Sequence, residues 1–239
     1  MLAVYMEKII NNKGDFGMIN ELRRSFKLLK FSVQFKSTIF SGLVFMIVGL
    51  LFEIFGKGEE ILGAIYFVIL PVLIFQLMVT LTCSKLVQSS PVKRRLQMTM
   101  PYLTTVPLEA LFAAAIIVYH SYLAKVGVTG VSFEENYTRQ AVYIFLVGLI
   151  VSCSFIYYGM CYKYMIVPTI LYAFVMVFVI QMVKRPDSPV YLFMGRSLSF
   201  SITAVICMFV VSVAFSILLS HLTYKHNLSS FITKRMLNK

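Results

Sequence analysis

Charged residues are scarce in this sequence: Asp, Glu, Lys and Arg make up only 13% of its 239 positions, whereas 59% are hydrophobic. A chain with so little polar surface cannot enclose a soluble core, so composition excludes a soluble globular protein. Acidic residues are the rarest charges, ten against 22 Lys and Arg, which gives a formal net charge of +12. In a membrane protein this excess reflects basic loops on the cytoplasmic side, so we expect no nucleic-acid partner.

The motifs of the common enzyme and metal sites are also missing. The four cysteines form neither a CxxC nor a Cys/His pattern, and we expect them to be reduced, buried and structural, with no metal site: Cys83, Cys153, Cys161 and Cys207. Gly56 and Lys57 spell GK, but Leu51 stands where a phosphate-binding loop needs glycine, so this chain binds no ATP by that route. Residues 1–17 lack the apolar core of a signal peptide, and no internal repeat is visible.

The sequence does contain six apolar runs with few or no charges, each close to the roughly 20 residues that a spanning helix needs. Backbone groups in lipid must pair within their own segment, and the runs lack the alternation of a barrel, so we predict helices. The fold class is therefore an all-α polytopic membrane protein with six transmembrane helices in one domain, residues 37–222. The runs are 38–55, 61–83, 102–123, 141–162, 165–183 and 197–222.

The distribution of Lys and Arg predicts the orientation. One set of alternate loops and ends holds sixteen of them, the other only six. Because basic loops stay in the cytoplasm, both termini are expected there: residues 1–36 at the start and the basic tail 223–239 at the end.

An amphipathic helix is predicted ahead of the first span. Its apolar residues recur at three- and four-residue intervals opposite a basic face, which suits a helix lying in the headgroup plane of an anionic leaflet. A solvated helix packed on a partner is the alternative. The residues of this interfacial helix are Ile19, Leu22, Arg23, Arg24, Phe26 and Leu29.

A basic segment, 84–101, separates the second and third runs. Ser90 is a favourable N-cap and Pro91 suits the first helical position, so a short helix should begin here. Pro101 disfavours helical geometry at the preceding residue, Met100, and should end that helix. Three consecutive basic residues, 93–95, lie within it, and no acidic residue occurs from 84 to 102.

In its architecture and in the stretch SSPVKRRLQMTMPYL, the chain resembles the membrane subunit of ABC transporters of the ABC-2, or type V exporter, family. Members carry a proline, a small aliphatic residue and basic residues at this place, followed by a helix that continues into the third span. The matching residues are Ser90, Pro91, Val92, Lys93, Arg94 and Arg95. The resemblance implies that this is the coupling helix, which seats in a groove of a separate ATPase subunit.

The resemblance implies an exporter in a cell membrane. In its size and in the lack of a large outer domain, the chain is similar to small permeases of Gram-positive bacteria that export amphipathic peptides such as phenol-soluble modulins. ATP and Mg would be bound by the partner ATPase and not by this chain, which would pair with a second permease chain as a homo- or heterodimer. Transport would follow from ATP-driven movement of the coupling helices. Polar candidates for the path are Gln76 and Gln181, with hydrogen bonding between helices as the alternative.

Glu109 is the most unusual residue within the runs, because an acid inside a span is costly unless it is paired or faces water. It is expected to line the path for cationic cargo, to form an ion pair between subunits, or to anchor a broken helix start at headgroup level. Glu53, near the outer end of the first run, is expected to be exposed at the interface.

Three other functions were weighed. Glu134, Glu135 and Arg139 spell EExxxR, the first motif of CAAX-protease-like peptidases, but they are expected in an outer loop, and the three histidines fit neither further motif of that family. An ion-coupled secondary transporter needs ionisable residues near the membrane midplane. Only Glu109 and His120 are candidates, and each is expected nearer an end of its run than the middle. A membrane scaffold or assembly protein shares the topology without needing an ATPase.

Overall fold

The computed structural model describes residues 27, 29, 34–82, 97–161, 164, 166–183, 190–191 and 197–224. Within these residues the chain forms six α-helices and no strand, which confirms the all-helical fold. The helices are α3 (Phe35–Gly56), α4 (Leu62–Thr82), α7 (Met100–Val126), α8 (Phe133–Cys161), α9 (Ile166–Val183) and α11 (Leu198–Thr223).

Five of these helices are long and apolar enough to cross a membrane, and α9 is a shorter apolar helix. Their bounds agree with the six predicted runs to within a few residues, except that α8 begins well before the expected residue 141. The chain therefore has the character of a helical membrane protein. Six spans and cytoplasmic termini remain predictions.

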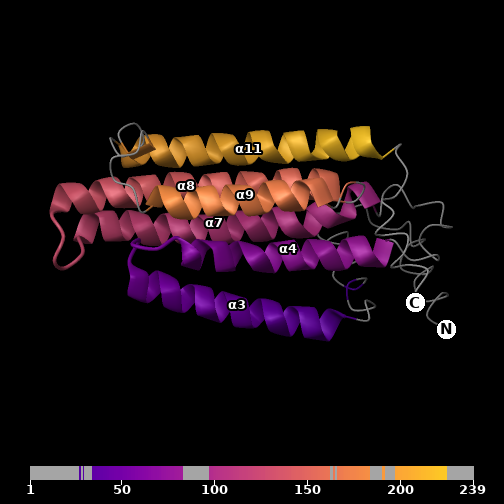
Figure 1. Ribbon diagram of the computed structural model, residues 1–239, viewed down its shortest axis with the longest axis horizontal. Coiled ribbons are helices and arrows are strands. Elements are labelled where there is room, and N and C mark those ends of the chain that lie inside the picture. Colours follow the sequence, from indigo (N-terminus) through magenta and orange to yellow (C-terminus); the bar gives the residue numbers. More distant parts are fainter. Residues whose placement is uncertain are drawn as a thin grey trace, which may run out of the picture.

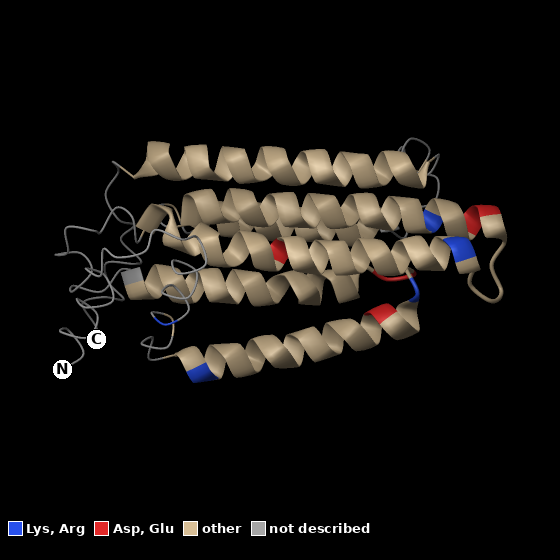
Figure 2. Cartoon of the chain, turned by 180° about the vertical axis from the view of Figure 1, so that it is seen from behind, with Lys and Arg blue, Asp and Glu red and all other residues tan. Residues whose placement is uncertain are grey.

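The six helices lie side by side along a common direction, and successive helices run in opposite directions (Figure 1). We call the two ends of this bundle the Met100 end, where α7 begins, and the Gly56 end, where α3 ends. Because the directions alternate, α3 begins and α11 ends at the Met100 end (Figure 1). Most charged residues of the described helices gather at the Gly56 end (Figure 2).

Helix α8 forms the centre of the bundle, since it packs against α4, α7, α9 and α11. Its apolar side chains are buried almost without interruption, and they form the core together with residues of α4 and α7. Helix α3 differs, because α4 is its principal neighbour and only Gly42, Gly49 and Glu53 are buried along it.

The α8 and α11 backbones approach closely where α8 carries glycine. A Cβ atom added at Gly159 would lie 2.9 Å from the Ser216 carbonyl oxygen and 3.2 Å from the Ser216 Cα. The buried positions on the facing side of α11 include Ser201, Ser212 and Ser216. Small residues at a helix crossing allow the van der Waals contact that drives helix association in lipid.

Replacing Gly159 with alanine is therefore expected to destabilise the bundle by about 1–3 kcal/mol, because a backbone atom cannot move aside for the new methyl group. Unfolding of the purified protein by SDS in mixed micelles measures this loss. The control is Gly56→Ala, since a Cβ there meets nothing within 4 Å. Equal stability of the two variants would contradict the close crossing.

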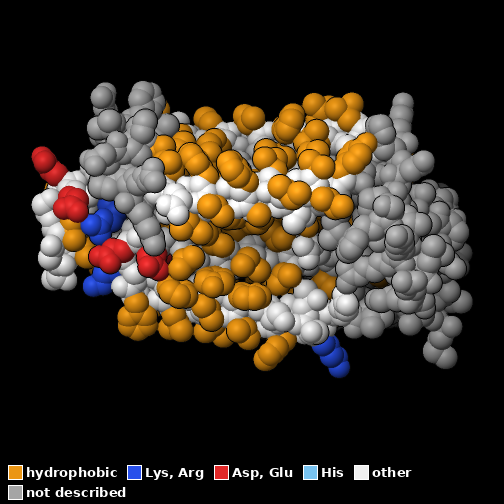
Figure 3. Space-filling view, viewed as in Figure 1, with side chains coloured by type: hydrophobic (Ala, Val, Ile, Leu, Met, Phe, Trp, Pro, Cys, Tyr) orange, Lys and Arg blue, Asp and Glu red, His pale blue; other side chains and the backbone are white. Residues whose placement is uncertain are grey.

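Large apolar side chains remain exposed along α3, α9 and α11, among them Phe40, Phe174 and Val211. On the face shown in Figure 3 they form a broad band across the middle of the bundle, with acidic and basic side chains concentrated toward one end. Such a band suits a lipid environment. Of the cysteines, Cys153 and Cys161 are buried as expected, but Cys207 is exposed on α11, so its predicted burial was wrong.

The start of α7 corrects another expectation. Met100 is helical and Pro101 occupies the first turn of α7, where proline is tolerated because that amide has no helical partner. The six coupling-helix residues 90–95 lie outside the described residues. So do the interfacial-helix residues except Leu29, which is buried against the core.

Candidate functional site

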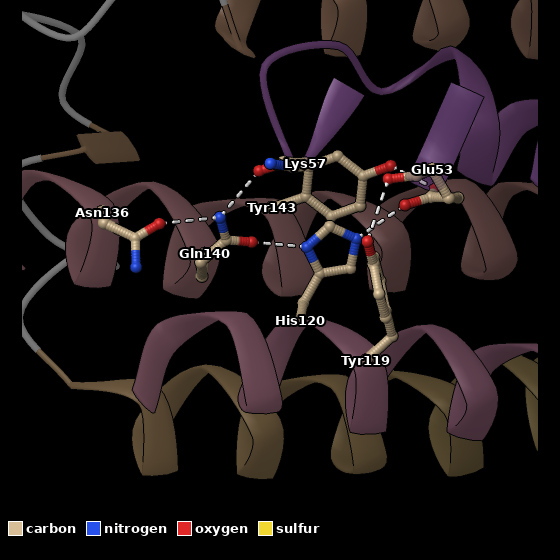
Figure 4. A network of polar contacts seen from close by, with 7 residues as sticks. All are labelled: Glu53, Lys57, Tyr119, His120, Asn136, Gln140 and Tyr143. Carbon is tan, nitrogen blue, oxygen red and sulfur yellow. Dashed lines mark hydrogen bonds and ion pairs between the residues drawn. The ribbon is translucent and has the colours of Figure 1, made fainter. Parts of the chain in front are cut away.

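A cluster of buried polar side chains lies at the Gly56 end and joins three helices (Figure 4). Glu53 comes from the last turn of α3, His120 from α7, and Gln140 and Tyr143 from α8. The side chains of His120 and Glu53 are 0% and 6% exposed. We call this cluster, together with Asn136, the Glu53–His120 network.

The carboxyl group of Glu53 has partners on both oxygens. Nε2 of His120 lies 2.7 Å from Oε2, and the Tyr143 hydroxyl donates to Oε1 at 2.5 Å. The expectation that Glu53 is exposed at the membrane interface is therefore wrong. A buried carboxyl group requires such partners, because leaving a charge or an acceptor unpaired in the interior costs on the order of several kcal/mol.

The neighbours of Gln140 determine where the protons of the network lie. Nε2 of Gln140 donates to the Lys57 carbonyl oxygen at 2.9 Å and to Oδ1 of Asn136 at 3.1 Å. Its Oε1 therefore faces Nδ1 of His120, 2.5 Å away. Because an amide oxygen can only accept a hydrogen bond, Nδ1 of His120 carries a proton and donates it in this bond. One further proton is then shared between Nε2 of His120 and Glu53, so the pair is neutral as a whole.

Packing holds the network in place. The imidazole of His120 stacks on the ring of Tyr143, with centroids 3.9 Å apart and planes 21° apart. The Tyr119 hydroxyl donates to the Glu53 carbonyl oxygen at 3.3 Å. A Cβ atom at Gly63 of α4 would lie 2.6 Å from Cγ of Glu53, so this position accepts only glycine. The side chains thus fasten the end of α3 to α7 and α8.

The chemistry open to this network is limited by its burial. Its members can hold or pass a proton, but a substrate cannot reach Glu53 or His120 in this conformation. Within the described parts of the chain, no group of three His, Cys, Asp or Glu residues is placed to hold a metal ion. The arrangement is that of a polar clamp between helices, with an acid and a base inside it.

No family model, curated protein or solved structure matches this chain. Its function must therefore be argued from its own residues.

The EExxxR residues lie in the first two turns of α8 and not in an outer loop, so that expectation was wrong. The glutamates are exposed, and Arg139 contacts Glu135 at 3.1 Å and Glu59 at 3.5 Å. Exposed pairs of this kind contribute about 0–1 kcal/mol. They form a charged surface rather than a buried pair of catalytic acids. Beside them, burial raises the pKa of Tyr191, an effect that Arg139 opposes.

The three candidate path residues have different surroundings: Gln76 and Glu109 are hydrogen-bonded to α8, whereas Gln181 is exposed. Gln76 donates to the Tyr157 hydroxyl at 3.1 Å, as expected for hydrogen bonding between helices, while Gln181 is exposed on α9. Glu109 is 0% exposed and accepts a hydrogen bond of 2.7 Å from Tyr158. Its anchoring role at headgroup level is wrong, because α7 is continuous from Met100.

An ion pair of Glu109 with a partner subunit is also excluded in this conformation, because its side chain has no exposed surface. Lining a path for cationic cargo stays a prediction.

Sequence reasoning missed the Glu53–His120 network, although a signal was present. Both residues interrupt apolar runs, and both precede the end of their helix by at most two turns. Since α3 and α7 run in the same direction, this places the acid and the histidine at similar depth. An acid and a histidine at one depth in two spans indicate a pair.

Proposed function

We propose that this chain is the membrane-spanning permease subunit of an ATP-driven exporter of the ABC-2 type. The observation that carries the proposal is the basic segment with Ser90, Pro91 and the three cations 93–95, between two apolar helices. Helix α4 ends and α7 begins at the Met100 end, and this segment lies between them in the sequence. A basic loop between two spans can contact a separate ATPase subunit. Through this contact, movement driven by ATP hydrolysis would be transmitted to a permease that has no ATPase site of its own.

Charge supports the orientation that this proposal requires. The ends and loops on the Met100 side hold sixteen Lys and Arg residues against six on the other side. The proposal therefore places the Met100 end in the cytoplasm of a bacterial cell membrane, within reach of a soluble ATPase. The permease acts as a homo- or heterodimer and moves amphipathic peptides outward.

Affinity purification from the native host tests the proposal. We expect an ATP-binding cassette subunit to co-purify, and we expect it to be lost when residues 93–95 are reversed in charge (Lys93→Glu, Arg94→Glu and Arg95→Glu). The matched control reverses exposed cations of the Gly56 end, Lys57→Glu and Lys125→Glu, and should retain the subunit.

Other outcomes would replace the proposal. Purification of the chain alone would support a scaffold, and uptake driven by a pH gradient in liposomes without ATPase would support a secondary transporter. Within an intact complex, ATP hydrolysis that stays constant across a panel of amphipathic peptides would contradict the peptide cargo.

A further inference from the structure

Glu109 lies in an environment that no role described above explains. The carboxyl group is fully buried in α7, and only its Oε1 is hydrogen-bonded, by the Tyr158 hydroxyl of α8. Oε2 has no hydrogen-bond partner. A buried acceptor without a partner costs about 1–3 kcal/mol, and more if the group is charged. This second oxygen therefore indicates that something is bound there.

The neighbouring helices provide no cation. Helices α4 and α9 contain no charged residue, and the only basic side chain in α11, His221, is exposed. From α9, the Tyr172 hydroxyl interacts electrostatically with Glu109. Within α7 itself, His120 is already bonded to Glu53 and Gln140. The cations of α8 are confined to Arg139 at the opposite end.

A metal ion does not fit this place either. One carboxyl group and a tyrosine hydroxyl supply far fewer oxygens than the six or so that alkali and alkaline-earth ions take. A proton on Oε2 fits, because it makes the buried group neutral and leaves Oε1 free to accept from Tyr158.

A small cavity at the Met100 end borders Tyr158, the hydrogen-bond partner of Glu109. It has a volume of about 20 Å³ and is lined by Gln97, Tyr102, Tyr158 and Ser220, among others. Gln97 is 8% exposed, and neither polar atom of its amide has a partner. A cavity of this size holds about one water molecule, and unpaired polar groups on its wall favour one. Tyr158 borders both the cavity and Glu109.

We propose that Glu109 is a proton-binding site, reached from the Met100 end through the Gln97 cavity and Tyr158. A proton that enters from the Met100 end as hydronium is passed by water in the cavity to the Tyr158 oxygen, while the hydroxyl hydrogen of Tyr158 passes to Oε1 of the Glu109 carboxylate. Rotation of the neutral carboxyl group then carries its proton to the Oε2 position, so that the unprotonated oxygen again accepts from Tyr158. The water and the tyrosine end unchanged, and the glutamate becomes a neutral acid. This site does not depend on the exporter proposal, since it needs neither an ATPase nor a cargo.

Infrared spectroscopy of the purified chain in liposomes tests the site without any partner subunit. At neutral pH we expect the carbonyl stretch of a protonated carboxyl group, and we expect Glu109→Gln to remove it. Glu53→Gln is the control, because Glu53 is the other buried carboxyl group of the described helices and its variant should keep the band. Tyr158→Phe should raise the pH at which the band disappears by about one unit, because the carboxylate loses its donor.

Exchange in D₂O tests the route. The Glu109 band should shift as its proton is replaced by deuterium. This exchange should be slower in Gln97→Leu than in the wild type. Gln181→Leu should exchange at the wild-type rate, because Gln181 is exposed. Circular dichroism confirms that each variant folds. The proton site is overturned if the wild type has no such band, or if Glu109→Gln leaves the intensity of the band unchanged. Equal exchange rates in Gln97→Leu and the wild type overturn the route through the cavity.

Discussion

Replacement of His120 with alanine is expected to destabilise the protein by about 3–5 kcal/mol, the usual cost of leaving one member of a buried pair without its partner. Glu53 would keep the Tyr143 hydroxyl but lose the group that shares its proton, and Gln140 would lose the donor to its amide oxygen. SDS unfolding in mixed micelles measures the change. Tyr122→Ala is the control in the same helix, since Tyr122 is 59% exposed.

A double-mutant cycle separates pairing from packing. The variant with both Glu53→Leu and His120→Leu should lose less stability than the sum of the two single changes, by at least about 1 kcal/mol. Its recovery stays incomplete, because in the double variant the Tyr143 hydroxyl loses the carboxyl group that it donates to, and Oε1 of Gln140 loses the donor of His120. Strictly additive losses would show that Glu53 and His120 do not interact as a pair.

The clamp made by the Glu53–His120 network matters because α3 has little else to hold it. Two of its three buried residues are glycines that approach α4, and the rest of the helix is mostly exposed. Side-chain bonds from α7 and α8 to Glu53, together with the bond from Gln140 to the Lys57 carbonyl oxygen, are thus described polar contacts that tie α3 to the centre of the bundle. Any conformational change that moves α3 relative to α7 and α8 would have to break these contacts.

The helices were predictable from the sequence because the requirement for about 20 apolar residues acts on each run separately. The early start of α8 was not, because Glu134, Glu135 and Arg139 interrupt the apolar pattern although they lie in helical turns. Asn136 and Gln140, in the same turns, face inward and are buried. Polar residues at the end of a span are therefore consistent both with a loop and with a helix that carries a buried network.

The role of Glu53 was not predictable from its depth alone. Its partner His120 is 67 residues away in the sequence, and its second partner Tyr143 is 90 residues away. Depth in the membrane is a property of one residue, whereas burial depends on which helices become neighbours. Glu109 shows the same limit, since its position within a span was evident but its bond to Tyr158 and its complete burial were not.

Replacement of Gln140 with leucine is expected to cost about 3 kcal/mol, although leucine is similar in size and far more apolar. The change leaves Nδ1 of His120, the Lys57 carbonyl oxygen and Oδ1 of Asn136 without the partner that Gln140 supplies, at about 1–3 kcal/mol for each group that stays buried. The expected loss is smaller than the full sum because the Lys57 turn is at the end of α3 and reaches solvent.

Gln181→Leu is the matched control for this prediction, because the same substitution at an exposed position of α9 removes no bond that holds the network. SDS unfolding should leave Gln181→Leu close to the wild type. Gln140→Glu adds a finer comparison: it can still accept from Nδ1 of His120 but no longer donates to Lys57 or Asn136. If Gln140→Leu proves as stable as Gln181→Leu, the hydrogen bonds of Gln140 do not hold the end of α3 to α8, and the proton assignment at His120 loses its basis.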